Sequence, residues 1–146
     1  MARVRTAALA LGLLALPSLA QQRTRAEEKP MKIRLTAGAR VLTATLLDDA
    51  TARDFAALLP LTLTLTDYAD TEKVSDLPRR LSTKGAPSGT AASAGDLTYY
   101  APWGNLAIFH KDFGHSRGLI RLGKLDGGVE ALRASDPIDV KIERWE

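Results

Sequence analysis

The sequence contains no cysteine, so disulfides, thiolate metal sites and cysteine nucleophiles are all excluded. Aromatic residues make up only 5% of the 146 residues and histidine occurs twice, so candidates for an aromatic or acid–base site are few. The length suits one domain. A domain of this size buries enough apolar surface to fold without covalent cross-links.

The sequence also lacks a large excess of charges of one sign. The net formal charge is +3, and Lys and Arg are interleaved with Asp and Glu throughout residues 29–146. Proteins that bind nucleic acids concentrate basic residues on one stripe or helix, and this chain has no such stretch. We therefore expect no nucleic-acid partner.

The one long apolar run in the sequence is too short to span a membrane. Residues 7–16 supply about half of the ~20 apolar residues that a transmembrane helix needs. Arg3 and Arg5 precede this run, and Ser18 and Ala20 follow it as small residues. That layout is typical of a secretory signal peptide. We expect residues 1–20 to be removed and the exported chain, periplasmic or secreted, to make no membrane contact.

The rest of the chain predicts a small β-rich domain. Residues 21–30 are polar and aperiodic, which favours a flexible linker leading into one domain, residues 31–146. Many short runs of β-type residues with few helices are typical of a mainly β domain, here a closed or nearly closed antiparallel barrel with one or two short helices. The expected strands are residues 33–37, 41–47, 61–66, 97–100, 106–109, 119–125 and 138–142, with irregular segments at 68–78, 82–95 and 110–118.

A short helix is expected between residues 48 and 59. Asp or Thr at its start can accept hydrogen bonds from the first backbone N–H groups. Phe55, Leu58 and Leu59 fall on one face, and Pro60 disfavours helical backbone in the residue before it. We therefore predict that the helix closes one end of the barrel with Phe55. A second short helix or turn is expected near residues 129–132.

Several motifs resemble those of cyclophilins. Residues 51–58 match T-x-x-N-F-x-x-L with Asp for Asn, and residues 95–98 read Gly-Asp-Leu-Thr. The chain is still more similar to a bacterial cyclophilin-like family, which shares L-L-P-L, G-x-P-S-G and G-D-x-x-Y-Y-x-P-W-G-N-L-A-I-F. These motifs stand here at residues 58–61, 85–89 and 95–109. The resemblance implies a cyclophilin-like β-barrel over nearly all of residues 31–146.

The sequence departs from true cyclophilins at the position of their active site. Cyclophilins carry an F-H-R strand shortly before the Gly-Asp motif, and its Arg stabilises the twisted prolyl amide. Residues 85–94 contain no Phe, His or Arg, and Arg79 and Arg80 lie earlier in an unrelated context. Peptidyl-prolyl isomerase activity is therefore expected to be weak or absent, and remains the alternative to a binding function.

The candidate ligand-binding residues gather between positions 99 and 117. Aromatic residues beside a Pro-Gly turn can line a cleft for proline or an extended peptide, or can simply fill the barrel. Neighbouring residues of a strand face opposite sides, so Tyr99 and Tyr100 cannot both face one cleft. The candidates are Tyr99, Tyr100, Trp103, Phe109, His110 and Arg117.

The two histidines do not by themselves define a catalytic or metal site. His110, Asp112 and His115 include two metal-ligating residue types, but no helical spacing holds them together. We therefore expect no metal and no cofactor. The sequence predicts an exported domain that binds a peptide or a small molecule in an aromatic cleft.

The leader yields a direct prediction, cleavage between Ala20 and Gln21. Intact-mass analysis of protein recovered outside the cytoplasm should show a chain that begins at Gln21, with the net charge lowered from +3 to +1 because Arg3 and Arg5 are lost. A mass that retains residues 1–20 would contradict the prediction.

Overall fold

The structure is a computed structural model that describes residues 12, 29–134 and 137–145. The predicted leader, apart from Gly12, and residues 21–28 of the predicted linker lie outside the described residues. Within the described ranges, no helix is long and apolar enough to cross a membrane.

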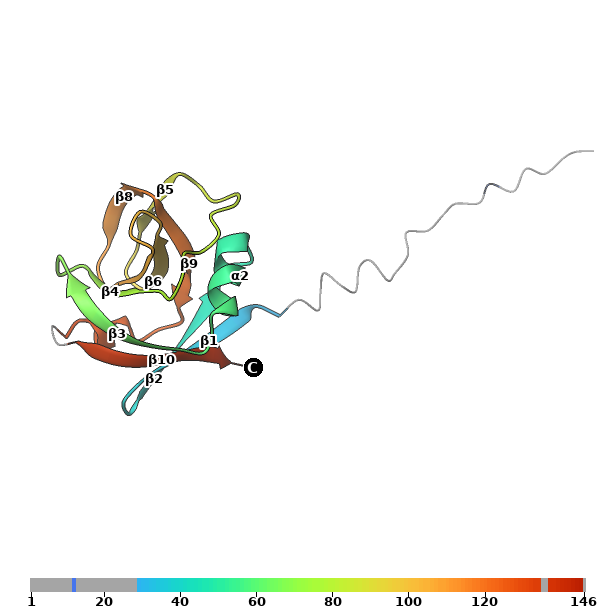
Figure 1. Ribbon diagram of the computed structural model, residues 1–146. Coiled ribbons are helices and arrows are strands. Elements are labelled where there is room, and N and C mark those ends of the chain that lie inside the picture. Colours follow the sequence, from blue (N-terminus) through green and yellow to red (C-terminus); the bar gives the residue numbers. More distant parts are fainter. Residues whose placement is uncertain (1–11, 13–28, 135–136, 146) are drawn as a thin grey trace, which may run out of the picture.

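Eight strands form a closed antiparallel barrel in the order β1-β10-β3-β4-β7-β6-β9-β2 (Figure 1). The predicted mainly β barrel is thereby confirmed, and it is fully closed. The strands of the barrel are β1 (Met31–Ala37), β2 (Arg40–Leu46), β3 (Leu61–Tyr68), β4 (Glu72–Asp76), β6 (Asp96–Tyr100), β7 (Asn105–Phe109), β9 (Leu119–Leu125) and β10 (Ile138–Trp145).

Alternation along the strands places the main hydrophobic core inside the barrel. In β3, Leu61 and Leu65 are buried whereas the threonines between them are exposed, as the strict alternation of this segment predicts. Ile33 and Leu35 of β1 and Ile142 of β10 join the same buried cluster. The interior is therefore filled with side chains and is not the place for a ligand.

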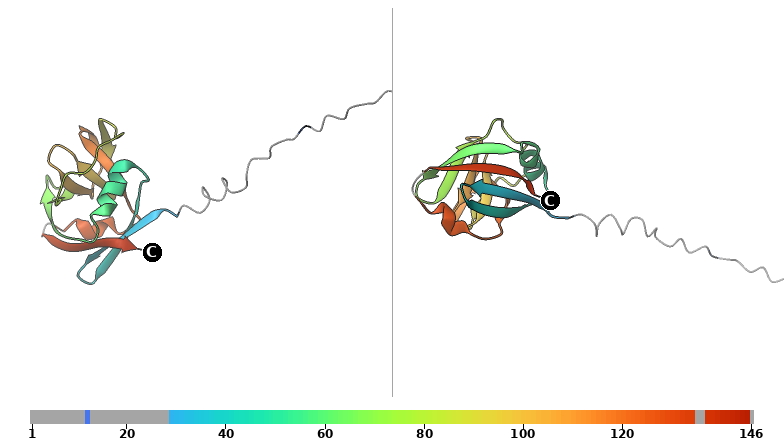
Figure 2. Two further views of the ribbon diagram at one scale, coloured as in Figure 1. Left: turned by 45° about the vertical axis from the view of Figure 1, so that its right-hand side comes forward. Right: turned by 90° about the horizontal axis from the view of Figure 1, so that it is seen from below.

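A short helix, α2 (Ala50–Ala57), lies at one end of the barrel (Figure 2). Asp49 caps it, since the Asp49 side chain accepts a hydrogen bond from the Ala52 N–H at 2.9 Å. Phe55 is fully buried in the barrel core, and the helix ends before Pro60, both as predicted. A 3-10 helix, η1 (Val129–Leu132), stands where a second short helix or turn was expected.

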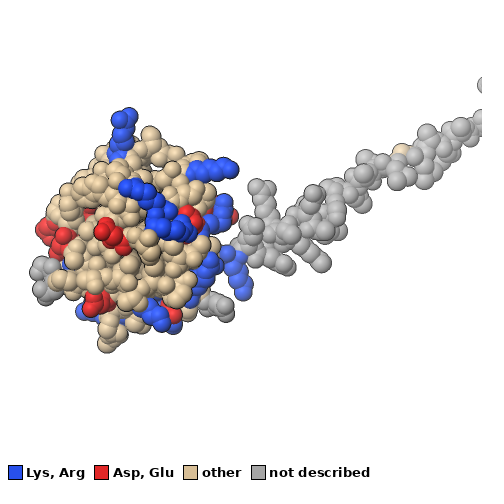
Figure 3. All heavy atoms as spheres, viewed as in Figure 1, with Lys and Arg blue, Asp and Glu red and all other residues tan. Residues whose placement is uncertain are grey.

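The surface mixes charges of both signs. On the face drawn in Figure 3, acidic side chains lie among the basic ones. One ion pair ties the segment after β4 to the helix: Arg79 pairs with Asp54 at 2.8 Å, and the Ser82 N–H also donates to Asp54. These hydrogen bonds hold the pKa of the Asp54 carboxyl below its usual range.

The expectation that residues 68–78 are irregular is wrong, because β4 lies within them. A tight turn at residues 69–71 brings Tyr68 opposite Glu72 and starts the strand. Ala69 and Asp70 adopt left-handed backbone angles in this turn, with φ of 51° and 55°. Turns of this kind usually contain glycine, which makes them recognisable in a sequence. No glycine is present in this turn, so the sequence carried no signal for the hairpin.

The loops expected at residues 82–95 and 110–118 each contain a strand. β5 (Gly89–Ala92) and β8 (Phe113–Arg117) pair with each other and form a separate two-stranded sheet outside the barrel. Their polar, mostly exposed residues lack the alternation that marks a half-buried strand. Gly89 permits the pairing, because a Cβ there would lie 2.4 Å from the Ser116 carbonyl oxygen.

The burial of Phe55 predicts a large effect of Phe55→Ala. Removing a fully buried ring leaves a cavity in the core and should lower the free energy of unfolding by about 3–5 kcal/mol. Chemical denaturation measures this change. Arg53→Ala, on the exposed side of the same helix, is the control and should cost no more than about 1 kcal/mol. Equal midpoints for the two variants would contradict the assignment of Phe55 to the core.

Candidate functional site

Strand β7 is buried on both of its faces. Leu106 and Ile108 point into the barrel core, whereas Ala107 and Phe109 belong to a second apolar cluster on the outside of the wall. Leu119 of β9 joins this outer cluster. Every residue of β7 is consequently buried, although outer faces of small barrels normally meet water.

The outer cluster is covered by the sheet of β5 and β8, which we call the flap (Figure 1). Hydrogen bonds join the two strands of the flap to each other at both ends: the Gly118 N–H donates to the Ser88 carbonyl at 2.8 Å, and the Ala94 N–H donates to the Asp112 carboxylate at 2.9 Å. Ala92 of β5 packs into the cluster beneath the flap. The flap and the barrel wall thus enclose a space between them.

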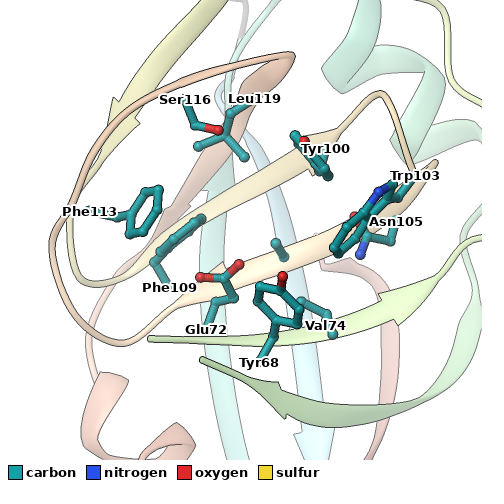
Figure 4. A pocket seen from close by; sticks show the side chains of 11 residues that line it. Tyr68, Glu72, Val74, Tyr100, Trp103, Asn105, Phe109, Phe113, Ser116 and Leu119 are labelled. Carbon is teal, nitrogen blue, oxygen red and sulfur yellow. The ribbon is translucent and has the colours of Figure 1, made fainter. Parts of the chain in front are cut away.

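That space is a pocket of about 200 Å³ (Figure 4). Its walls come from the β3–β4 hairpin, from β6, β7 and the turn between them, and from β8 and the start of β9. The lining residues are Tyr68, Glu72, Val74, Tyr100, Trp103, Asn105, Ala107, Phe109, Phe113, Ser116 and Leu119.

Five aromatic rings surround the pocket. Trp103 meets Tyr68 and Tyr100 edge-to-face, with ring centroids 5.4 and 5.2 Å apart, and Phe109 lies 5.7 Å from Phe113. Trp103 is 54% exposed, so it stands at the mouth of the pocket. Large aromatic residues that remain exposed beside a hollow are typical of ligand sites.

Glu72 is the one carboxylate that lines the pocket. Its side chain projects between Phe109 and Tyr68 (Figure 4). Burial raises the pKa of Glu72 above its usual range, and a hydrogen bond from the Thr71 hydroxyl at 2.5 Å lowers it by less. Among the described residues, Glu72 forms no ion pair with Lys, Arg or His.

Asn105 contributes a second acceptor. The residue is 5% exposed, and its Oδ1 accepts no hydrogen bond from the described part of the chain. A buried amide oxygen without a donor is energetically costly.

The structure brings together three of the six residues that the sequence singled out. Tyr100, Trp103 and Phe109 line the pocket. Tyr99 faces the barrel core, where its hydroxyl oxygen accepts a hydrogen bond from the Leu81 N–H at 3.1 Å. Tyr99 and Tyr100 thus face opposite sides, as the pleat of a strand requires.

The other two candidates lie outside the pocket. His110 is 1% exposed, and its Nε2 stands 3.5 Å from Asp67 Oδ1. Arg117 is exposed on the flap next to Ser116 and does not line the pocket. Within residues 29–134 and 137–145, no group of three or more His, Asp or Glu residues is placed to hold a metal ion.

Sequence reasoning missed Tyr68, Glu72 and Phe113. Tyr68 and Glu72 belong to the hairpin that was expected to be irregular, and Phe113 belongs to the flap strand that was expected to be a loop. Charged residues around Tyr68 and Glu72 give this segment the pattern of a solvated loop, so the sequence offered no signal that could have found them.

Comparison with known proteins agrees with this architecture. The model of the cyclophilin-like family matches residues 35–143. The chain belongs to the cyclophilin-like family. A solved structure of a hypothetical protein from Archaeoglobus fulgidus superimposes on it with a TM-score of 0.60, over 82% of this chain and 99% of that one. The two sequences are 17% identical, so this likeness concerns the fold alone. No curated protein matches the chain.

The raised pKa of Glu72 predicts that this side chain opposes folding at neutral pH. At low pH the Glu72 carboxyl is protonated and burial costs little. As the pH rises through the raised pKa, the carboxyl becomes charged in its partly buried position and the free energy of unfolding falls. Glu72→Gln should therefore raise the melting temperature at pH 7, and the gain should shrink as the pH approaches 4.

Asp76→Asn is the matched control for this measurement, because it removes the same charge from the exposed end of β4. Thermal melts of both variants between pH 4 and 8 test the prediction. A lower melting temperature for Glu72→Gln at pH 7 would contradict it.

Proposed function

We propose that this member of the cyclophilin-like family is an exported binding domain that holds a small ligand, or one side chain of a peptide, in the pocket under the flap. The five aromatic rings around an apolar floor carry the proposal. Pockets for drug-sized ligands measure about 300–1,000 Å³, so a space of about 200 Å³ suits a smaller group. The signal-like leader supports export of the domain to the periplasm or the medium.

Prolyl isomerisation is the alternative, and the lining of the pocket favours binding over it. No Lys or Arg is among the lining residues. Arg80 lies closer than its place in the sequence suggests, since it packs against Gly104, but its guanidinium donates to the Ala101 carbonyl at 2.7 Å outside the pocket. Loss of an electrostatic stabiliser of the transition state commonly lowers a rate by on the order of 10²–10³.

A test of this proposal uses Trp103 as the reporter of the pocket. In Trp145→Phe, which removes the other tryptophan, titration with a proline-containing tetrapeptide and a small-molecule fragment set should change the Trp103 fluorescence. Phe113→Ala should weaken any response, because it removes a ring from the flap side of the pocket. Its melting temperature should change little, since Phe113 is 42% exposed.

The same tetrapeptide then enters a prolyl isomerisation assay. We expect turnover to be absent or weak. Cyclophilin-like turnover that Arg80→Ala or Arg117→Ala abolishes would favour the isomerase. The binding function fails if no probe in the set alters Trp103 emission.

A further inference from the structure

Glu72 is the one charged residue among those that line the pocket. The side chains that line it include a carboxylate, an amide and three hydroxyl groups, from Glu72, Asn105, Tyr68, Tyr100 and Ser116. None of the lining residues is Lys, Arg or His. A ligand in this pocket therefore meets one negative charge, neutral groups that both donate and accept hydrogen bonds, and no fixed positive charge.

The aromatic rings add to this negative potential. The face of an aromatic ring carries the negative end of its quadrupole and attracts cations within about 6 Å of the ring centre. Tyr68 and Phe109 flank the Glu72 carboxylate, and Phe113 and Trp103 line the same hollow (Figure 4). Cages of aromatic rings recognise quaternary ammonium groups in other proteins.

We propose that the pocket selects an organic ammonium cation, with the Glu72 carboxylate as its counter-charge and the surrounding aromatic rings as its cage. This inference rests on the binding function proposed above and names its class of ligand.

Charge complementarity distinguishes this ligand from neutral and anionic ones. A neutral group that enters the pocket removes water from Glu72 without replacing it by an opposite charge, and an anion is repelled. A cation instead compensates the carboxylate that burial already disfavours. The volume of about 200 Å³ fits an ammonium head group better than a larger molecule.

Choline and 3,3-dimethyl-1-butanol provide a matched pair of probes. They have nearly the same shape and the same hydroxyl group. The branch point is a positively charged nitrogen in choline and a neutral carbon in 3,3-dimethyl-1-butanol. Fluorescence titration of Trp103 in the purified Trp145→Phe chain should show choline binding about tenfold more tightly than its neutral analogue.

Glu72→Gln and Asp76→Asn test the role of the carboxylate. The first keeps the shape of the side chain and should weaken choline binding about tenfold, while binding of 3,3-dimethyl-1-butanol becomes tighter because no charge is desolvated. The second removes an equal charge from the same strand outside the pocket and should leave both affinities unchanged. Thermal melts confirm that both variants are folded.

The source of the ammonium group is resolved by a third probe, N-acetyl-trimethyllysine methylamide. Tighter binding of this compound than of choline assigns the site to a modified peptide side chain, and the reverse assigns it to a small solute. Equal binding of choline and its neutral analogue would overturn the cation inference and leave the binding function intact. If none of the three probes changes the Trp103 fluorescence, the cation inference is overturned. If the fragment set also leaves the fluorescence unchanged, the binding function is overturned as well.

Discussion

The burial of β7 on two sides is the constraint on which the rest of the site depends. Its inward residues, Leu106 and Ile108, complete the barrel core, and its outward residues, Ala107 and Phe109, need a second cover. Burial of one such large side chain contributes roughly 1.5–3 kcal/mol, so the flap has an energetic reason to lie on the wall. Because the flap does not close completely over the outer face, a hollow remains between the flap and the barrel wall.

The hairpin that carries Glu72 is anchored from inside the barrel. Lys73, the next residue, is fully buried and lies 3.2 Å from Asp67, and Asp67 also stands beside His110. Buried charges persist only where opposite charges and hydrogen bonds offset the loss of water. Lys73 points inward, and that orientation directs its neighbour Glu72 to the outside and into the pocket.

The residues that line the pocket lower the stability of the fold. Trp103, Tyr68 and Phe113 keep a large part of their rings in water, and Glu72 is held where burial disfavours its charge. Stability alone would favour covering those rings and replacing the carboxylate. The barrel and its family therefore account for the scaffold, whereas the proposed binding function depends on this particular set of side chains.

The sequence by itself determined the barrel, the capped helix and the family. Regular alternation in residues 61–66, the apolar face with Phe55 and the long motif at residues 95–109 are local patterns that need no partner to be recognised. Only the tertiary structure decided where the pocket lies. Its walls come in part from the hairpin at residues 68–74 and in part from the flap near residue 113. Neither segment shows a regular pattern of apolar and polar residues in the sequence. They become strands because distant backbone groups pair with them, and such pairing leaves no periodic trace in the segment itself.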